Sequence, residues 1–143
     1  MSRFVGRGEQ EAGWEDHLGA ARLAPDDYVA EAIAGAVQQV AATVDSPAVV
    51  AYTHRGPTAL RIARERPICP VLGVTPTVQA ARRLALVWGV RAFVSQPHTV
   101  STTVEQMVAD ALDVVSRAGI GSAGDSVVID ARVPCGVSVA TNL

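Results

Sequence analysis

The chain has 143 residues, of which 49% are hydrophobic and 18% are charged, and its formal net charge at pH 7 is −2. This composition predicts one compact domain rather than a disordered chain, and the charge gives no electrostatic reason to expect nucleic acid or an anionic membrane as a partner. All twelve basic residues are arginine, which excludes chemistries that need a lysine, such as Schiff-base formation.

Cysteine content and hydropathy narrow the class of protein further. The two cysteines, Cys69 and Cys135, are too few for a disulfide scaffold, and no cysteine and histidine spacing resembles a zinc site. No apolar run reaches the ~18 residues of a membrane-spanning helix, and residues 1–7 lack the apolar centre of a signal peptide. We therefore expect a cytoplasmic protein with no metal site and no membrane partner.

The N-terminal part divides into an arm and the start of a domain. Residues 1–25 contain several glycines and many charges, which predicts an arm with at most a weak helix, followed by a single domain over residues 26–143. That domain starts with a helix that Asp26 or Asp27 caps and that ends near residues 45–47. Its predicted buried face consists of apolar residues at helical spacing: Val29, Ile33, Val37, Val40 and Val44, with Ala30, Ala36 and Ala41 filling in.

The most informative stretch follows this helix. Residues 48–52 are apolar without alternation, which is typical of a strand buried on both faces. Gly56 gives a turn its conformational freedom, and Pro57 suits the first position of a helix that runs to about residue 65. The free N–H groups at the start of that helix, and the positive end of its dipole, favour an anion.

Side chains in the same turn add further donors. Thr53 and Thr58 provide hydroxyl groups, and Arg55 provides a guanidinium that can bind phosphate through two hydrogen bonds. The turn at residues 53–58, called the 53–58 turn below, is therefore a candidate phosphate site. The alternative is that the turn holds only water and that Arg55 faces solvent or pairs with a nearby acid.

Short apolar strands and helices alternate through the rest of the chain. A strand over 71–74 precedes a helix that Thr75 caps and Gly89 ends. A second helix starts with a capping box of Thr102 and Glu105. The remaining predicted segments are a strand over 90–94, a polar loop over 95–101, a strand over 126–130 and a loop over 132–143.

This alternation predicts an α/β fold with three layers, αβα, around a mainly parallel central sheet of about four to five strands. In such sheets, ligands bind beyond the carboxyl ends of the strands. Thr53, Thr75, Ser95 and Ala131 mark those ends. The 53–58 turn therefore lies on the edge of the sheet where a ligand is expected.

Several segments, in order, resemble the C-terminal domain of pyruvate kinase. They are 49–53 with Gly56, Thr58 and Ala59, then 66–75, 84–90, 124–125, 133–138 and 141–142. Residues 1–25 resemble the helix that links the catalytic barrel of that family to this domain. The resemblance implies a domain for allosteric regulation of a glycolytic kinase, a transferase, in which a sugar phosphate or nucleotide monophosphate effector acts through the interfaces of a homo-oligomer.

The resemblance also implies which residues bind the effector. Carried over by position, the phosphate-binding residues are Thr53, His54, Arg55, Gly56 and Thr58, with Arg132 and Gly136 closing over them. Arg55 stands where the family usually has a serine, and Pro57 follows the glycine.

Two parts of the family are missing from this sequence. The first is the catalytic barrel, which supplies the catalytic lysine and the ligands of Mg²⁺ and K⁺. We therefore expect no catalytic residues and no cofactor in this chain, which would be inactive alone, as an excised domain or a separately encoded fragment. The second is the family's final strand, which often helps to pair subunits.

Two alternatives stay open. The domain could be a purely structural module for subunit assembly that binds no ligand. It could also be a stand-alone enzyme for phosphate-ester chemistry that uses Cys135 or His54, although the sequence shows no pair of nucleophile and base and no metal cluster.

Overall fold

Four parallel strands form the centre of the computed structural model, which describes residues 28–95 and 103–131. The strand order is β3-β2-β1-β4, and every neighbouring pair is parallel. In the register, Val49 lies opposite both Val71 and Val128. The strands are β1 (Val49–Tyr52), β2 (Val71–Thr75), β3 (Val90–Val94) and β4 (Val128–Asp130).

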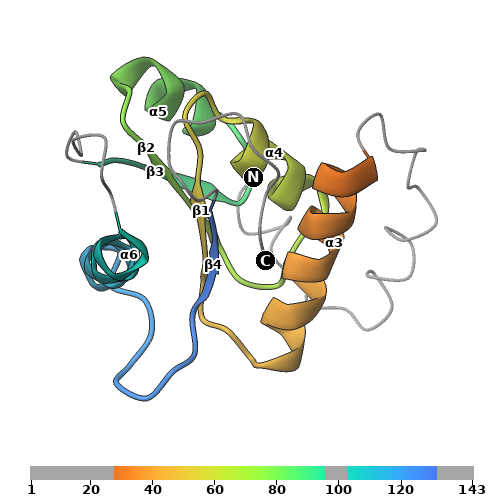
Figure 1. Ribbon diagram of the computed structural model, residues 1–143, viewed down its shortest axis with the longest axis vertical. Helices are drawn as coiled ribbons and strands as arrows, with labels where there is room; N and C mark the ends of the chain where they lie inside the picture. The colour runs from red at the N-terminus through yellow and green to blue at the C-terminus, as the bar shows by residue number, and fades with distance from the viewer. Residues whose placement is uncertain (1–27, 96–102, 132–143) are drawn as a thin grey trace, which may run out of the picture.

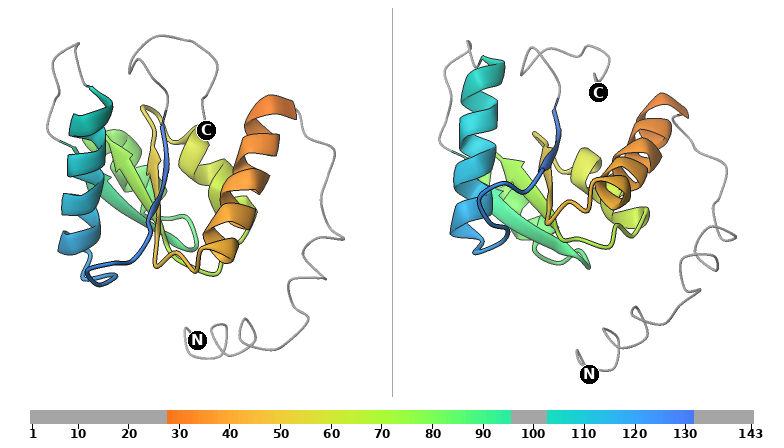
Figure 2. Two further views of the ribbon diagram at one scale, coloured as in Figure 1. Left: turned by 60° about the horizontal axis from the view of Figure 1, so that its bottom comes forward. Right: turned by 90° about the horizontal axis from the view of Figure 1, so that it is seen from below.

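Helices cover both faces of this sheet (Figures 1 and 2). Three of them pack on one face: α3 (Tyr28–Thr43), α4 (Pro57–Arg64) and α5 (Val78–Leu84). The fourth, α6 (Val104–Arg117), packs on the other face. The predicted three-layer αβα fold with a parallel sheet is confirmed.

The two central strands are buried as their apolar runs predict. Val49, Val50 and Ala51 of β1 are 0% exposed, and every residue of β2 is buried. Their side chains alternate between two apolar clusters, one under α3, α4 and α5 and one under α6. The hydroxyl of Tyr52 donates to the Met107 carbonyl at 2.7 Å and so ties β1 to α6.

Two predicted helix caps lie elsewhere in the structure. Thr77, not Thr75, caps α5 by accepting a hydrogen bond from the Ala80 N–H at 3.3 Å, because Thr75 is still the last residue of β2. The capping box of α6 is formed by Thr103 and Gln106, not by Thr102 and Glu105. Each prediction was wrong by one or two residues, because neighbouring side chains in both segments are also able to cap a helix.

The buried faces of the helices also differ from the prediction. Val29 and Val40 of α3, and Val44 just after it, are exposed, whereas Ala34 and the expected Ala41 lie in the core with Ile33 and Val37. Small side chains let α3 approach the sheet and α4 closely, so they occupy the contact. Trp88, which follows α5, is 46% exposed, and the guanidinium of Arg66 lies 6.0 Å from the centre of its ring.

Several predictions fall outside the described residues and stay predictions. They concern the arm over 1–25, the caps Asp26 and Asp27, Cys135 and the loop over 132–143. Among the described residues, no helix has the length and hydropathy to cross a membrane.

Candidate functional site

A turn at the carboxyl edge of the sheet joins β1 to α4. Gly56 caps α4 with φ 112° and ψ −19°, and Pro57 occupies the first turn of the helix. Residues with a side chain rarely adopt such a φ, so the glycine allows the chain to reverse here. The predicted combination of Gly56 and Pro57 thus starts the helix where the sequence places it.

Hydrogen bonds fix the shape of this turn. The Gly56 N–H donates to Thr53 Oγ1 at 2.9 Å, and the Leu60 N–H donates to the Gly56 carbonyl at 3.1 Å. The N–H groups of Thr58 and Ala59 precede that first helical bond, so the helix itself provides no acceptor for them. The N–H of half-buried Thr58 is therefore the backbone donor at the start of α4 that can face solvent, because Ala59 is fully buried and Gly56 serves the turn itself.

The predicted site residues lie in this one turn but point in different directions. His54 and Arg55 are exposed, whereas Thr53 and Gly56 are buried. Thr58 is half-buried. The other two predicted residues, Arg132 and Gly136, lie outside the described residues. The structure therefore brings five of the seven residues together in one turn. Two of the five are exposed: the imidazole of His54 and the guanidinium of Arg55.

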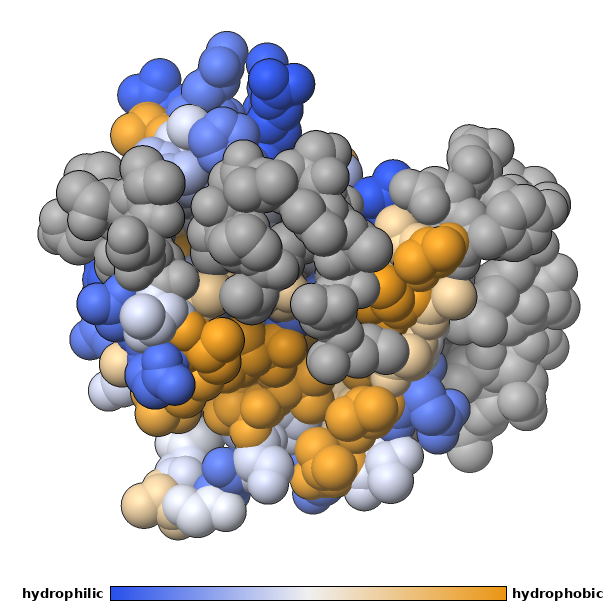
Figure 3. All heavy atoms as spheres, in the orientation of Figure 1, coloured by the Kyte–Doolittle hydropathy of each residue, from blue (hydrophilic) through white to orange (hydrophobic). Residues whose placement is uncertain are grey.

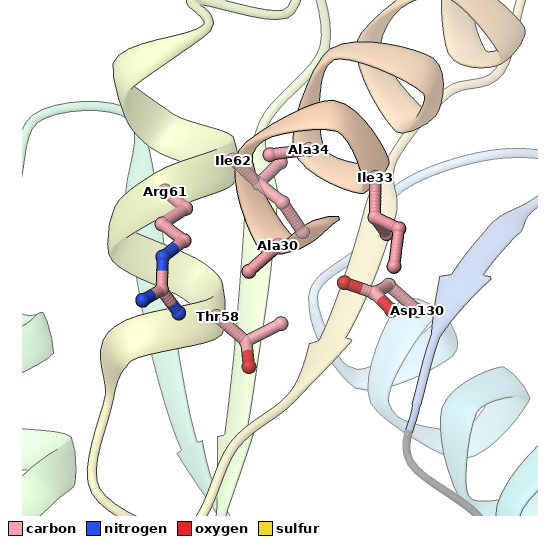
Figure 4. A pocket seen from close by; sticks show the side chains of 7 residues that line it. All are labelled: Ala30, Ile33, Ala34, Thr58, Arg61, Ile62 and Asp130. Carbon is pink, nitrogen blue, oxygen red and sulfur yellow. The ribbon is translucent and has the colours of Figure 1, made fainter. Parts of the chain in front are cut away.

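The Thr58 side chain lines a small cleft between α3, α4 and the end of β4 (Figure 4). The free volume of this cleft is about 10 Å³, which is the room of about one water molecule. Arg61 and Asp130 also line it, together with Ala30, Ile33, Ala34 and Ile62. A sugar phosphate does not fit in this cleft, so a ligand at this edge would bind over the turn.

Two charged residues of the cleft were missed by sequence reasoning. Arg61 lies one helical turn after Thr58, and its Nε is 3.5 Å from Glu31 Oε1. Asp130 is only 4% exposed at the carboxyl end of β4. The helical spacing from Thr58 to Arg61 could have indicated Arg61 from the sequence. No local sequence pattern predicts that Asp130 lies beside α4.

A second buried threonine contacts the turn from behind. Thr75 is 0% exposed, and its Oγ1 donates a hydrogen bond to the His54 carbonyl at 3.1 Å. Leu84 of α5 contacts the same turn, because a Cβ atom at Gly56 would lie 3.5 Å from Leu84 Cδ2. The turn is thus supported by β2 and α5 as well as by its own hydrogen bonds.

The described residues offer little to metal-dependent or thiol chemistry. Within residues 28–95 and 103–131, no group of three or more His, Cys, Asp or Glu side chains could hold a metal ion. Cys69 is half-buried, and burial raises the pKa of its thiol. A raised pKa reduces the thiolate fraction, which is the opposite of what a nucleophile needs.

Comparison with known proteins finds one family. The family described as "Pyruvate kinase, alpha/beta domain" matches residues 31–143. The chain is 35% identical to a pyruvate kinase of Methylorubrum extorquens over 100% of this chain and 29% of that protein. It is 36% identical to a pyruvate kinase of Geobacillus stearothermophilus over 100% of this chain and 24% of that protein.

Solved structures agree on the fold. The crystal structure of a pyruvate kinase from Cryptosporidium parvum superposes with a TM-score of 0.77 and 24% sequence identity, covering 92% of this chain and 27% of that chain. This chain therefore spans less than a third of the length of the relatives that it matches.

Proposed function

We propose that this chain, which belongs to the pyruvate kinase family through that family's alpha/beta domain, binds a phosphorylated effector at the 53–58 turn. In this proposal the chain has a regulatory role and carries no catalytic residue. The effector class is a sugar phosphate or a nucleotide monophosphate, and the binding energy biases an interface of a homo-oligomer.

The observation that carries this proposal is the set of donors on the turn. Arg55 and His54 are exposed, and the N–H of half-buried Thr58 precedes the hydrogen-bond ladder of α4. The positive end of a helix dipole amounts to about half an elementary charge, which stabilises an anion placed there. A guanidinium beside such an amide is well suited to a phosphate group.

Calorimetry with a small panel of phosphate compounds tests the proposal. The panel is fructose 1,6-bisphosphate, glucose 6-phosphate, ribose 5-phosphate and AMP, and at least one should bind. Arg55→Ala should weaken that binding about tenfold or more, because it removes a charge-assisted contact. Arg117→Ala makes the same change of charge on α6, on the opposite face of the sheet, and should bind like the unmodified chain.

Two results would contradict the proposal. One is the absence of binding by all four compounds. The other is equal weakening by Arg55→Ala and Arg117→Ala, which would show a general charge effect rather than a site.

Subunit assembly without a ligand is a second candidate, and one surface favours it. Among the described strands, β4 pairs only with β1 and lies at the edge of the sheet. Figure 3 shows a hydrophobic area (orange) over β4 and the lower half of α3. Separately, Val40 of α3 and Val44 just after it are each 44% exposed. Sedimentation should then show a dimer that survives Arg55→Ala and does not respond to phosphate, whereas a monomer at every concentration would exclude it.

A further inference from the structure

A buried hydroxyl group sets the direction of one peptide group in the 53–58 turn. Thr75 Oγ1 donates to the His54 carbonyl oxygen at 3.1 Å and accepts a hydrogen bond from the Thr77 N–H at 3.4 Å. Because Thr75 is 0% exposed, the His54 carbonyl that contacts it points toward the interior of the domain.

The direction of that carbonyl decides the direction of the next N–H group. A trans peptide group is planar and holds its C=O and N–H on opposite sides. The His54 carbonyl points inward, so the N–H of Arg55 in the same peptide group points outward. The exposed side chain of Arg55 and its backbone donor therefore both leave the turn on its solvent side.

We infer that Thr75 is a positioning residue for the phosphate site: its hydroxyl holds the peptide group between His54 and Arg55 so that the Arg55 N–H faces the anion. This inference rests on the proposed function. If the peptide group turned over, the carbonyl oxygen with its partial negative charge would face the anion in place of the N–H, which would repel the anion. A hydroxyl that prevents this rotation raises affinity without touching the ligand.

Other contacts fix the rest of the turn, so Thr75 has a separable task. The Thr53 side chain holds the Gly56 N–H, and Leu84 contacts Gly56. Neither contact involves the peptide group between His54 and Arg55. The cap of α5 is the hydrogen bond from the Ala80 N–H to the Thr77 side chain. The Thr75 hydroxyl takes no part in that bond, although its removal also takes away the acceptor of the Thr77 N–H.

Three variants separate positioning from stability. Thr75→Val removes the hydroxyl and keeps the branched shape, Thr75→Ser keeps the hydroxyl, and Thr77→Val removes the cap of α5 but leaves the turn alone. Binding of inorganic phosphate and of fructose 1,6-bisphosphate is measured by calorimetry. In parallel, the ¹⁵N–¹H signal of the Arg55 amide is followed during phosphate titration.

We expect Thr75→Val to bind about tenfold more weakly, since one hydrogen bond that orders the site is lost. The shift of the Arg55 amide signal on phosphate addition should vanish in this variant. Thr75→Ser and Thr77→Val should both bind like the unmodified chain, although Thr77→Val should unfold at lower denaturant. If Thr75→Val does not fold, Thr75→Cys replaces it, because a thiol is a weak donor of similar size, and its affinity should still fall below that of Thr75→Ser.

The outcomes distinguish this inference from the proposed function. Binding by the unmodified chain, with equal affinity and an equal Arg55 shift in Thr75→Val, overturns the role of Thr75 and leaves the phosphate site standing. Absence of binding by the unmodified chain overturns the phosphate site itself, and the positioning role with it.

Discussion

Thr53 Oγ1 accepts a hydrogen bond from the Gly56 N–H at 2.9 Å, and this contact closes the turn between β1 and α4. Thr53 is only 7% exposed, so the bond is shielded from water. It holds the backbone at the one position of the turn with a φ of 112°. A turn that is closed before a ligand arrives loses less conformational freedom on binding, which favours affinity.

Thr53→Val should therefore lower both stability and phosphate affinity. The Gly56 N–H would lose its partner in a buried place, which costs about 1–3 kcal/mol. Urea unfolding measures this change in the free energy of unfolding, and calorimetry measures the affinity. Thr53→Ser, which keeps the hydroxyl, is the matched control and should restore both. Unfolding midpoints that are the same for Thr53→Val and the unmodified chain would contradict this role of the hydrogen bond.

Gly73→Ala should destabilise the domain for a steric reason. A Cβ atom at Gly73 would lie 3.0 Å from Leu84 Cδ1 and 3.4 Å from Val90 Cγ1, and Leu84 is 1% exposed with little room to move. Overpacking of this kind costs about 1–3 kcal/mol, which denaturant unfolding can measure.

A double variant tests the named contact behind this prediction. Leu84→Val shortens the side chain that the new methyl group would meet. The Gly73→Ala, Leu84→Val pair should therefore lose less stability than the sum of the two single variants. Strict additivity would show that Leu84 is not the cause.

The fold could be predicted from the sequence because its signals are local. The apolar runs of β1 and β2, and the glycine and proline that start α4, reflect burial and backbone conformation at those positions. The positions of the helix caps could not be predicted, because Thr75 and Thr77 carry the same side chain. Which of them caps α5 depends on where β2 ends, and β2 includes Thr75. The buried face of α3 was predicted only in part: Ile33 and Val37 are buried as expected, but the close approach of helices selects Ala34 over Val40.

The same distinction holds for the candidate site. Thr53, Arg55 and Gly56 could be proposed from the sequence because they lie close together in one turn. The sequence places Thr75 at the end of a strand, but only the order of the sheet brings its hydroxyl to the His54 carbonyl and brings Asp130 beside α4. Supporting residues from separate elements carry no signal in the local pattern.

The carboxyl group of Glu105 should titrate below its usual range. Hydrogen bonding by its own backbone, and then by the Thr103 side chain, lowers the pKa of Glu105. A lowered pKa in the folded state means that ionised Glu105 favours folding above its unfolded pKa, and that this contribution is lost as the pH falls through the folded value. NMR titration of the Glu105 carboxyl carbon measures the midpoint directly.

Thr103→Ala should raise this midpoint without restoring it fully, because the backbone hydrogen bond remains. Gln106→Ala is the control: it removes the other half of the capping box and leaves the Thr103 hydroxyl, so the pKa of Glu105 should stay low. A midpoint that does not move in Thr103→Ala would contradict the contact between the two side chains. The same variant should also lower stability by about 1 kcal/mol, the usual cost of losing such a cap.

The thiol of Cys69 should react slowly in the folded protein. Burial raises its pKa above the ordinary value of 9.0, and the thiolate is the reactive form. In a Cys135→Ser background, where Cys69 is the one thiol left, alkylation by iodoacetamide at pH 8 should be slower in the native protein than in urea. The pH midpoint of the native rate should also lie above that of the unfolded chain. Because the unfolded chain then ionises first as the pH rises, the free energy of unfolding should fall above pH 9. Equal rates in the native and unfolded protein would show that Cys69 is open to solvent.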